Sequence, residues 1–129
     1  MTATLPHVLL AEDNAMVGAA LRILFEETGH RFTLAATVAD TVAACVASPV
    51  DLLLLDLGLA EEDGLQALAQ LRARDAMPRV AVAMTGQDAS DVRERCRAAG
   101  CLDVLTKPVP TRELLRMTHE WLSLTPPKG

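Results

Sequence analysis

Short apolar runs alternate along this chain with longer stretches in which apolar residues are spaced as on one face of a helix. Leu52 to Leu55 are four leucines without a polar break, a pattern typical of a strand that is buried on both faces. Other short runs resemble it, although the second along the chain is weaker. The predicted strands are His7–Ala11, Arg31–Ala36, Val50–Asp56, Arg79–Met84 and Cys101–Leu105.

The stretches between these runs predict amphipathic helices. In the first stretch apolar residues recur at helical spacing and Gly29 supplies a stop. Thr37 and Asp40 resemble the capping box that opens a helix, and Pro49 closes that helix. The residues predicted to face inward are Val17, Ala20, Leu21, Leu24, Phe25 and Thr28 in the first helix, Val42, Ala43 and Val46 in the second, Leu65, Leu68 and Leu71 in the third, Val92 and Cys96 in the fourth, and Leu114, Leu115, Thr118, Trp121 and Leu122 in the fifth.

Breaking and capping residues set the remaining boundaries. The third helix follows Gly64 and ends before Pro78. Residues 88–91 are predicted to cap the fourth helix, which ends at Gly100. The fifth helix covers about Thr111–Leu122.

Strands that alternate with helices through short crossovers predict an α/β fold. We expect a single doubly wound, five-stranded parallel sheet with five helices, because the strand-like runs are buried and the stretches between them are helical. One domain is expected over residues 1–129, with a core at about 7–122 and a tail at 123–129.

Composition excludes several classes of protein. The net charge is −5 and no basic cluster is present, which argues against nucleic-acid binding. The longest apolar run is far below the roughly 20 residues that span a bilayer, and the N-terminus lacks the features of a secretion signal. The cysteines, Cys45, Cys96 and Cys101, are odd in number and have no metal-ligand spacing, so we expect reduced thiols in a cytoplasmic protein without membrane association.

Chemically capable side chains follow four of the predicted strands. Glu12 and Asp13 follow the first strand and Asp56 ends the third. Thr85 follows the fourth strand and Lys107 follows the fifth. Because the carboxyl ends of parallel strands lie at one edge of the sheet, where such folds bind ligands, we expect these side chains to converge.

Carboxylates brought together in this way repel one another. Two like charges about 4 Å apart repel by about 4 kcal/mol at an effective dielectric constant near 20. A hard divalent cation such as Mg²⁺ would offset this repulsion, since Mg²⁺ takes one or two carboxylates and keeps several waters. Asp13 and Asp56 are the predicted direct ligands, the Gly58 carbonyl is a third, and Glu12 acts through water.

With the cation in place, Asp56 has a free oxygen that can attack a phosphoryl donor. Phosphoryl transfer depends on positioning and on stabilising the charge that develops on the equatorial oxygens. Mg²⁺ would meet one oxygen and the Lys107 ammonium a second. The Thr85 hydroxyl and a nearby backbone N–H would meet the third.

In order and spacing, the chain from about residue 7 to 122 resembles the receiver domain of response regulators, the chemotaxis-regulator-like phosphoacceptor of bacterial two-component signalling. The resemblance implies a flavodoxin-like sheet of strand order 2-1-3-4-5 and a cis peptide bond at Lys107-Pro108. The features that carry it are the pair Glu12-Asp13, Asp56 after its apolar strand, Asp63-Gly64, Thr85 and Lys107-Pro108. The implied roles are phosphoacceptor for Asp56, magnesium site for Glu12, Asp13, Asp56 and Gly58, switch hydroxyl for Thr85, and phosphate partner for Lys107.

The resemblance also implies a function. A sensor histidine kinase or a phosphotransfer protein would phosphorylate Asp56, and the face formed by the fourth helix, fifth strand and fifth helix would change its contact with a downstream protein. Such a switch assists its own phosphorylation and dephosphorylation but is not a turnover enzyme. A homodimer is a further partner that such folds allow. The chain is expected to be either a stand-alone regulator, favoured by its starting Met and proline-rich tail, or a receiver from a larger protein.

Three positions depart from the family pattern. The Tyr or Phe that often stands three residues before the lysine is Val104, so the coupling of Thr85 to the outer face is expected to differ or to be weaker. The usual proline of the loop after the phosphoacceptor is Ala60, and the phenylalanine common after Lys-Pro is Val109. Gly58 has no side chain to cover an acyl phosphate, which predicts fast dephosphorylation.

Other functions remain open at this point. A pseudo-receiver would bind partners without ever taking phosphate, although the intact acidic set argues against it. An aspartate-nucleophile phosphohydrolase of the dehalogenase type would carry D-x-D, whereas the second acid is replaced here by Gly58. Flavin binding on the same fold would need an aromatic pair to sandwich the ring, and the chain has few aromatic residues.

Overall fold

The structure, a computed structural model, describes residues 5–86 and 90–124. All neighbouring strands of its sheet are parallel, in the order β2-β1-β3-β4-β5. This confirms the predicted doubly wound fold and its strand order. The elements are β1 (His7–Ala11), α1 (Ala15–Glu27), β2 (Arg31–Ala35), α2 (Val38–Ala47), β3 (Leu52–Asp56), the 3₁₀ turn η1 (Leu59–Glu61), α3 (Leu65–Ala73), β4 (Val80–Thr85), α4 (Ser90–Ala99), β5 (Asp103–Thr106) and α5 (Thr111–Leu124).

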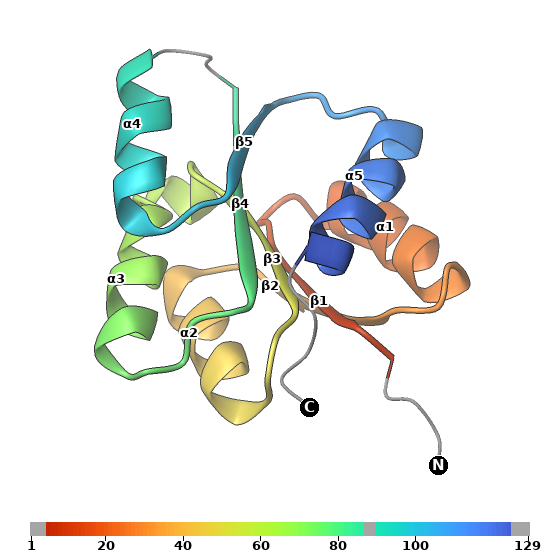
Figure 1. Cartoon of the computed structure of the whole chain (residues 1–129), viewed down its shortest axis with the longest axis horizontal. Coiled ribbons are helices and arrows are strands. Elements are labelled where there is room, and N and C mark those ends of the chain that lie inside the picture. The colour runs from red at the N-terminus through yellow and green to blue at the C-terminus, as the bar shows by residue number, and fades with distance from the viewer. Residues whose placement is uncertain (1–4, 87–89, 125–129) are drawn as a thin grey trace.

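Helices cover both faces of the sheet. Helices α1 and α5 lie on one face, and α2, α3 and α4 lie on the other (Figure 1). Because side chains alternate along a strand, Leu53 and Leu55 belong to the core under α2–α4, whereas Leu52 and Leu54 belong to the core under α1 and α5. All four are fully buried, and each burial contributes roughly 2 kcal/mol to stability. Strand β3 is therefore held from both sides.

Several predicted helix ends are confirmed by their local geometry. The Thr37 side chain accepts a hydrogen bond from the Asp40 backbone N–H at 3.0 Å, which caps α2. Gly29, at φ 87°, follows α1, and Gly100, at φ 107°, follows α4. Both lie in the left-handed region that glycine adopts without strain, so both helices stop where the sequence predicts.

The inward face predicted for α2 is partly wrong. Ala43 and Val46 are exposed, Val46 by 50 %. The start of the helix is as predicted, but the buried residues fall at i, i+3, i+4 and i+7 from Val38, so the stripe that meets the core lies on a different side of the helix from the predicted one. The buried residues of α2 are Val38, Thr41, Val42 and Cys45.

The α1 prediction is right for its central residues and wrong for those at its two ends. Leu21 and Phe25 are buried, whereas Val17, Ala20 and Thr28 are exposed. Near the start of α1 it is Gly18 that is buried, while Val17 and Ala20 lie at the rim of a groove described below.

Element boundaries differ from the predicted ones by a few residues. Thr85 is the last residue of β4, η1 forms in the predicted loop, and Ser123 and Leu124 continue α5 instead of starting a tail. Of the predicted α4 cap, residues 88 and 89 lie outside the described part of the chain. Among the described residues, no helix is long and apolar enough to cross a membrane.

The cysteines are buried free thiols, as predicted. Burial disfavours the thiolate and raises the pKa of Cys45 to about 11 and that of Cys101 to about 12. Burial also raises the pKa of Cys96. These thiols therefore behave as small apolar core residues.

Gly64 should not tolerate a side chain, because the backbone at the start of the β3–α3 loop lies directly against it. A Cβ at this position would lie 2.5 Å from the Asp56 carbonyl oxygen and 3.1 Å from Leu57 Cα. Its φ of −56° is ordinary, so the constraint is space. We expect Gly64→Ala to lower the free energy of unfolding by about 1–3 kcal/mol in urea titrations. Gly86→Ala is the control, since a Cβ there meets nothing within 4 Å, and equal loss in both variants would contradict this reading.

Candidate functional site

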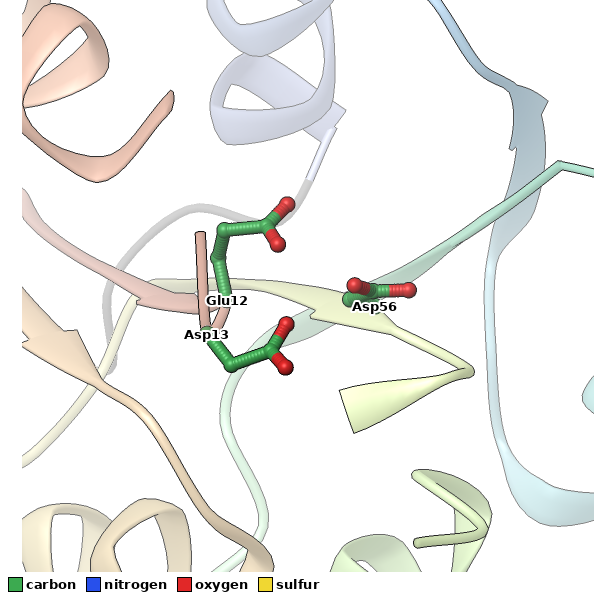
Figure 2. A group of neighbouring side chains, drawn as sticks. All are labelled: Glu12, Asp13 and Asp56. Atoms are coloured by element: carbon green, nitrogen blue, oxygen red, sulfur yellow. The ribbon is translucent and has the colours of Figure 1, made fainter. Parts of the chain in front are cut away.

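Three carboxylates meet at the carboxyl ends of β1 and β3. Glu12 and Asp13 directly follow β1, and Asp56 ends β3, the strand paired with β1. One carboxylate oxygen from each residue lies within 4.8 Å of the other two. Figure 2 shows the three side chains turned toward a common space. The structure thus brings together the three acids that the sequence singled out.

The three acids differ in burial. Glu12 is 2 % exposed and Asp56 is 8 % exposed, whereas Asp13 lies at the surface. A backbone N–H supports each buried carboxylate: that of Asn14 donates to Glu12 Oε2 at 3.2 Å, and that of Gly58 donates to Asp56 Oδ1 at 3.0 Å. The backbone therefore fixes one oxygen of each buried acid.

Lys107 joins the two buried acids. Its Nζ lies 3.0 Å from Glu12 Oε1 and 3.1 Å from Asp56 Oδ2. Partial burial alone would lower the pKa of the Lys107 ammonium, but its hydrogen bonds to Glu12 and Asp56 outweigh burial and raise that pKa above its ordinary value. The Lys107 backbone N–H also donates to the Thr85 carbonyl at 2.8 Å, and the Lys107-Pro108 bond is cis, as the family resemblance implies.

Thr85 and Gly58 border the same edge from the α4 side. Thr85, 8 % exposed at the end of β4, lines a hollow of about 320 Å³ together with Gly58. The Gly58 carbonyl accepts a hydrogen bond from the Glu61 N–H at 3.3 Å, which leaves one lone pair of that oxygen for another partner. We call this space the loop–α4 hollow. The residues that line it are Leu57, Gly58, Asp63, Leu65, Thr85, Val92 and Arg95.

The departures from the family pattern have visible consequences. Ala60 adopts φ 49°, a value that the ring of proline forbids, so this loop could not keep its conformation with proline at that position. Val104 packs, partly buried, against the core on the α2–α4 side. Val109 lines a groove of about 510 Å³ between α1 and α5, which begins at Glu12 and Lys107 and is otherwise mostly apolar.

The donor set suits a hard divalent cation. All three acidic side chains offer oxygen ligands, and a single ammonium leaves the cluster with net negative charge. Oxygen ligands in partly open sites are typical of Mg²⁺. The residues present therefore fit this ion.

Sequence reasoning missed one feature beside the site. Arg95 Nη2 lies 3.0 Å from Asp63 Oδ2, and both residues line the loop–α4 hollow. The sequence marks Asp63 only through the Asp63-Gly64 motif. Its partner is 32 residues further along, and nothing in the sequence pairs the two.

Comparison with known families agrees with the fold. The sequence model described as response regulator receiver domain matches residues 8–119. The chain belongs to this family. As a receiver domain it is a module of two-component signalling.

The relatives of this receiver domain are mostly longer proteins. It is 32 % identical over 109 residues to the TorCAD operon transcriptional regulatory protein TorR of Escherichia coli O157:H7, with 84 % of this chain and 46 % of that protein covered. It is 36 % identical over 117 residues to the sensor histidine kinase AruS of Pseudomonas aeruginosa, with 88 % of this chain and 12 % of that protein covered. The chain therefore spans less than half the length of either relative.

One solved structure with a similar fold contains a magnesium ion. The receiver domain of the sensor histidine kinase PA1611 from Pseudomonas aeruginosa PAO1 is 29 % identical, with a TM-score of 0.78 over 93 % of this chain and 99 % of that one. That structure has a magnesium ion coordinated in its active site cleft.

Asp13 is expected to destabilise the metal-free receiver domain. Its negative charge adds to the charges of Glu12 and Asp56, whose carboxylates lie within a few ångströms. Lys107 already neutralises part of the charge on those two carboxylates. Asp13→Asn should raise the free energy of unfolding by about 0.5–1 kcal/mol in urea with EDTA, and KCl should shrink the gain by screening. Lower stability of the variant at low salt would show that the repulsion is absent.

Proposed function

We propose that this receiver domain accepts a phosphoryl group on Asp56 in a Mg²⁺-dependent reaction, with a sensor histidine kinase or a phosphotransfer protein as donor. The observation that carries the proposal is the Lys107 ammonium held between Glu12 and Asp56 while Asp13 lies beside them. A merely structural ion pair would need neither the third acid nor its exposure. The magnesium-containing relative supports the same reading.

The proposed magnesium ligands are Asp13, Asp56 and the Gly58 carbonyl, with Glu12 acting through water. When bound, Mg²⁺ supplies positive charge to one phosphoryl oxygen. Glu12 is nearly sealed from solvent and hydrogen-bonded to Lys107, which suits an indirect role better than direct ligation.

The chain's own residues then position the transfer. An Asp56 oxygen forms the new bond to phosphorus while the bond from phosphorus to the donor's leaving atom breaks, and the leaving group keeps the electron pair. Lys107, already 3.1 Å from Asp56 Oδ2, stabilises a second phosphoryl oxygen. The Thr85 hydroxyl, at the end of the neighbouring strand, is proposed to meet the third.

The proposed output is altered protein contact. Phosphorylation shifts the population between two arrangements of the α4–β5–α5 face, and a downstream protein senses the shift to the extent that it binds one arrangement better. A homodimer could be such a partner. With a net charge of −5, this region is not proposed to bind nucleic acid by itself, and it is proposed to act as a switch and not as a turnover enzyme.

A donor protein that reaches Asp56 has to cover the edge of the sheet. The groove between α1 and α5 begins at Glu12 and Lys107, so the same donor would also cover it. Exposed Met16 at the start of α1, with 83 % of its surface accessible, adds apolar area beside that groove. This arrangement supports a protein as the physiological donor.

Phosphorylation of a single residue tests the proposal. With Mg²⁺ and acetyl phosphate, the intact mass should increase by one phosphate in the wild type and not at all in Asp56→Asn or in the presence of EDTA. Asp75→Asn is a matched control, because Asp75 is exposed at φ 54°, where asparagine is well tolerated. Absence of phosphate on the wild type would instead favour the pseudo-receiver alternative.

The missing side chain at Gly58 makes a second prediction about the same site. A Cβ there would lie 3.8 Å from Asp56 Oδ1, so a longer side chain would cover the acyl phosphate against water. We expect Gly58→Asn to lengthen the half-life of the phosphoprotein about fivefold, the equivalent of roughly 1 kcal/mol in the barrier. The half-life of phosphorylated Gly58→Ala should fall between those of the wild type and Gly58→Asn. An unchanged half-life, followed by intact mass after donor removal, would count against water access at Gly58.

A further inference from the structure

Helix α4 is anchored at its C-terminal end. Cys96 is its buried side chain, and the Cys101 N–H donates to the Cys96 carbonyl at 2.9 Å across the Gly100 turn. Arg72 Nη2 reaches from α3 to the Ala99 carbonyl at 3.1 Å. These contacts fix the end of α4 that lies farthest along the chain from Thr85.

Closer to the site, α4 is joined to the β3–α3 loop by an ion pair. Arg95 Nη2 lies 3.0 Å from Asp63 Oδ2, while Asp63 Oδ1 accepts the Leu65 N–H at 3.1 Å. Asp63 thus caps α3 with one oxygen and holds α4 with the other. Both side chains are about half exposed, so the pair is weak enough to change partners.

The same arginine lines the space beside Asp56. Arg95, Gly58 and Thr85 all border the loop–α4 hollow, and Arg95 is the cationic member of its lining. The Gly58 N–H donates directly to Asp56. A phosphoryl group on Asp56 would bring about −1.5 to −2 of charge and new acceptor oxygens to this hollow.

We infer that Arg95 is the positioning residue through which the phosphoryl charge reaches α4. On phosphorylation it leaves Asp63 and turns toward the phosphoryl oxygens, which holds α4 against the hollow while the Cys96–Ala99 end stays fixed. This inference rests on the proposed phosphorylation of Asp56. It gives α4 a charge-based link to the site in a chain that has Val104 where related domains often have an aromatic ring.

Two variants separate this role from a merely structural ion pair. Asp63→Asn removes the resting partner of Arg95 but keeps an oxygen that can cap α3. Arg95→Gln removes the cation itself. Arg97→Gln is the control, because Arg97 lies on the same helix and pairs only loosely, at 3.7 Å, with Glu94.

Hydrogen exchange of α4 amides, with phosphate uptake followed by intact mass in the same samples, tests the inference. Without phosphate, Asp63→Asn and Arg95→Gln should both exchange faster than wild type by about two- to fivefold, since both lose the pair. After phosphorylation, exchange should slow in wild type, Asp63→Asn and Arg97→Gln but not in Arg95→Gln. Arg95→Lys should restore part of the response.

The alternatives give different results. If Asp63→Asn and Arg95→Gln behave alike in both states, the pair is only structural and the inference is overturned. If Arg95→Gln takes phosphate and hydrogen exchange of its α4 amides slows as in the wild type, the inference is overturned while the phosphoacceptor role stands. If the wild type takes no phosphate, the proposed function fails and the inference fails with it.

Discussion

The contact of one ammonium with two buried carboxylates is the interaction on which this site depends. Lys107 arrives from the end of β5, whereas Glu12 and Asp56 come from β1 and β3, so the contact spans most of the sheet edge. Without the Lys107 ammonium, the Glu12 carboxylate, which is only 2 % exposed, would have a single backbone N–H as its partner. Burying an unpaired charge is strongly unfavourable, and the geometry of the edge therefore follows from electrostatics as much as from packing.

The leucines of β3 give that interaction a rigid base. Leu52–Leu55 are fixed on both faces of the sheet, and a shift of one residue would turn every side chain to the wrong face. Asp56 follows them directly in β3, so the packing of the leucines also fixes its place at the end of the strand. The Gly64 N–H donates to the Leu57 carbonyl at 3.0 Å, which holds the loop close beside Asp56. The Asp56 carboxylate is therefore held in place, and neighbouring charged groups have to compensate its charge.

The sequence could predict most of this arrangement because its signals were local or topological. Apolar runs marked the strands, and a parallel sheet necessarily gathers Glu12, Asp13, Asp56 and Lys107 at one edge. Failures occurred where tertiary geometry decides. The exposure of Val46 depends on which side of α2 meets the core, and the left-handed conformation of Ala60, which the sequence did not predict, depends on the loop around it. The magnesium and phosphoryl roles remain predictions, since geometry places these groups without showing their reaction.

The site and α4 differ in how firmly they are held, and this difference is what a switch requires. The acceptor edge is built mainly on β1, β3 and β4, whose side chains are buried, whereas α4 buries Cys96 and otherwise relies on exposed or partly exposed contacts. Segments with few buried contacts open or shift at low free energy, while a packed sheet does not. The proposed change of charge at the edge would therefore have little effect on the sheet and would act mainly on the loosely held elements beside it. The weakness of α4 is in this sense a functional property of the fold.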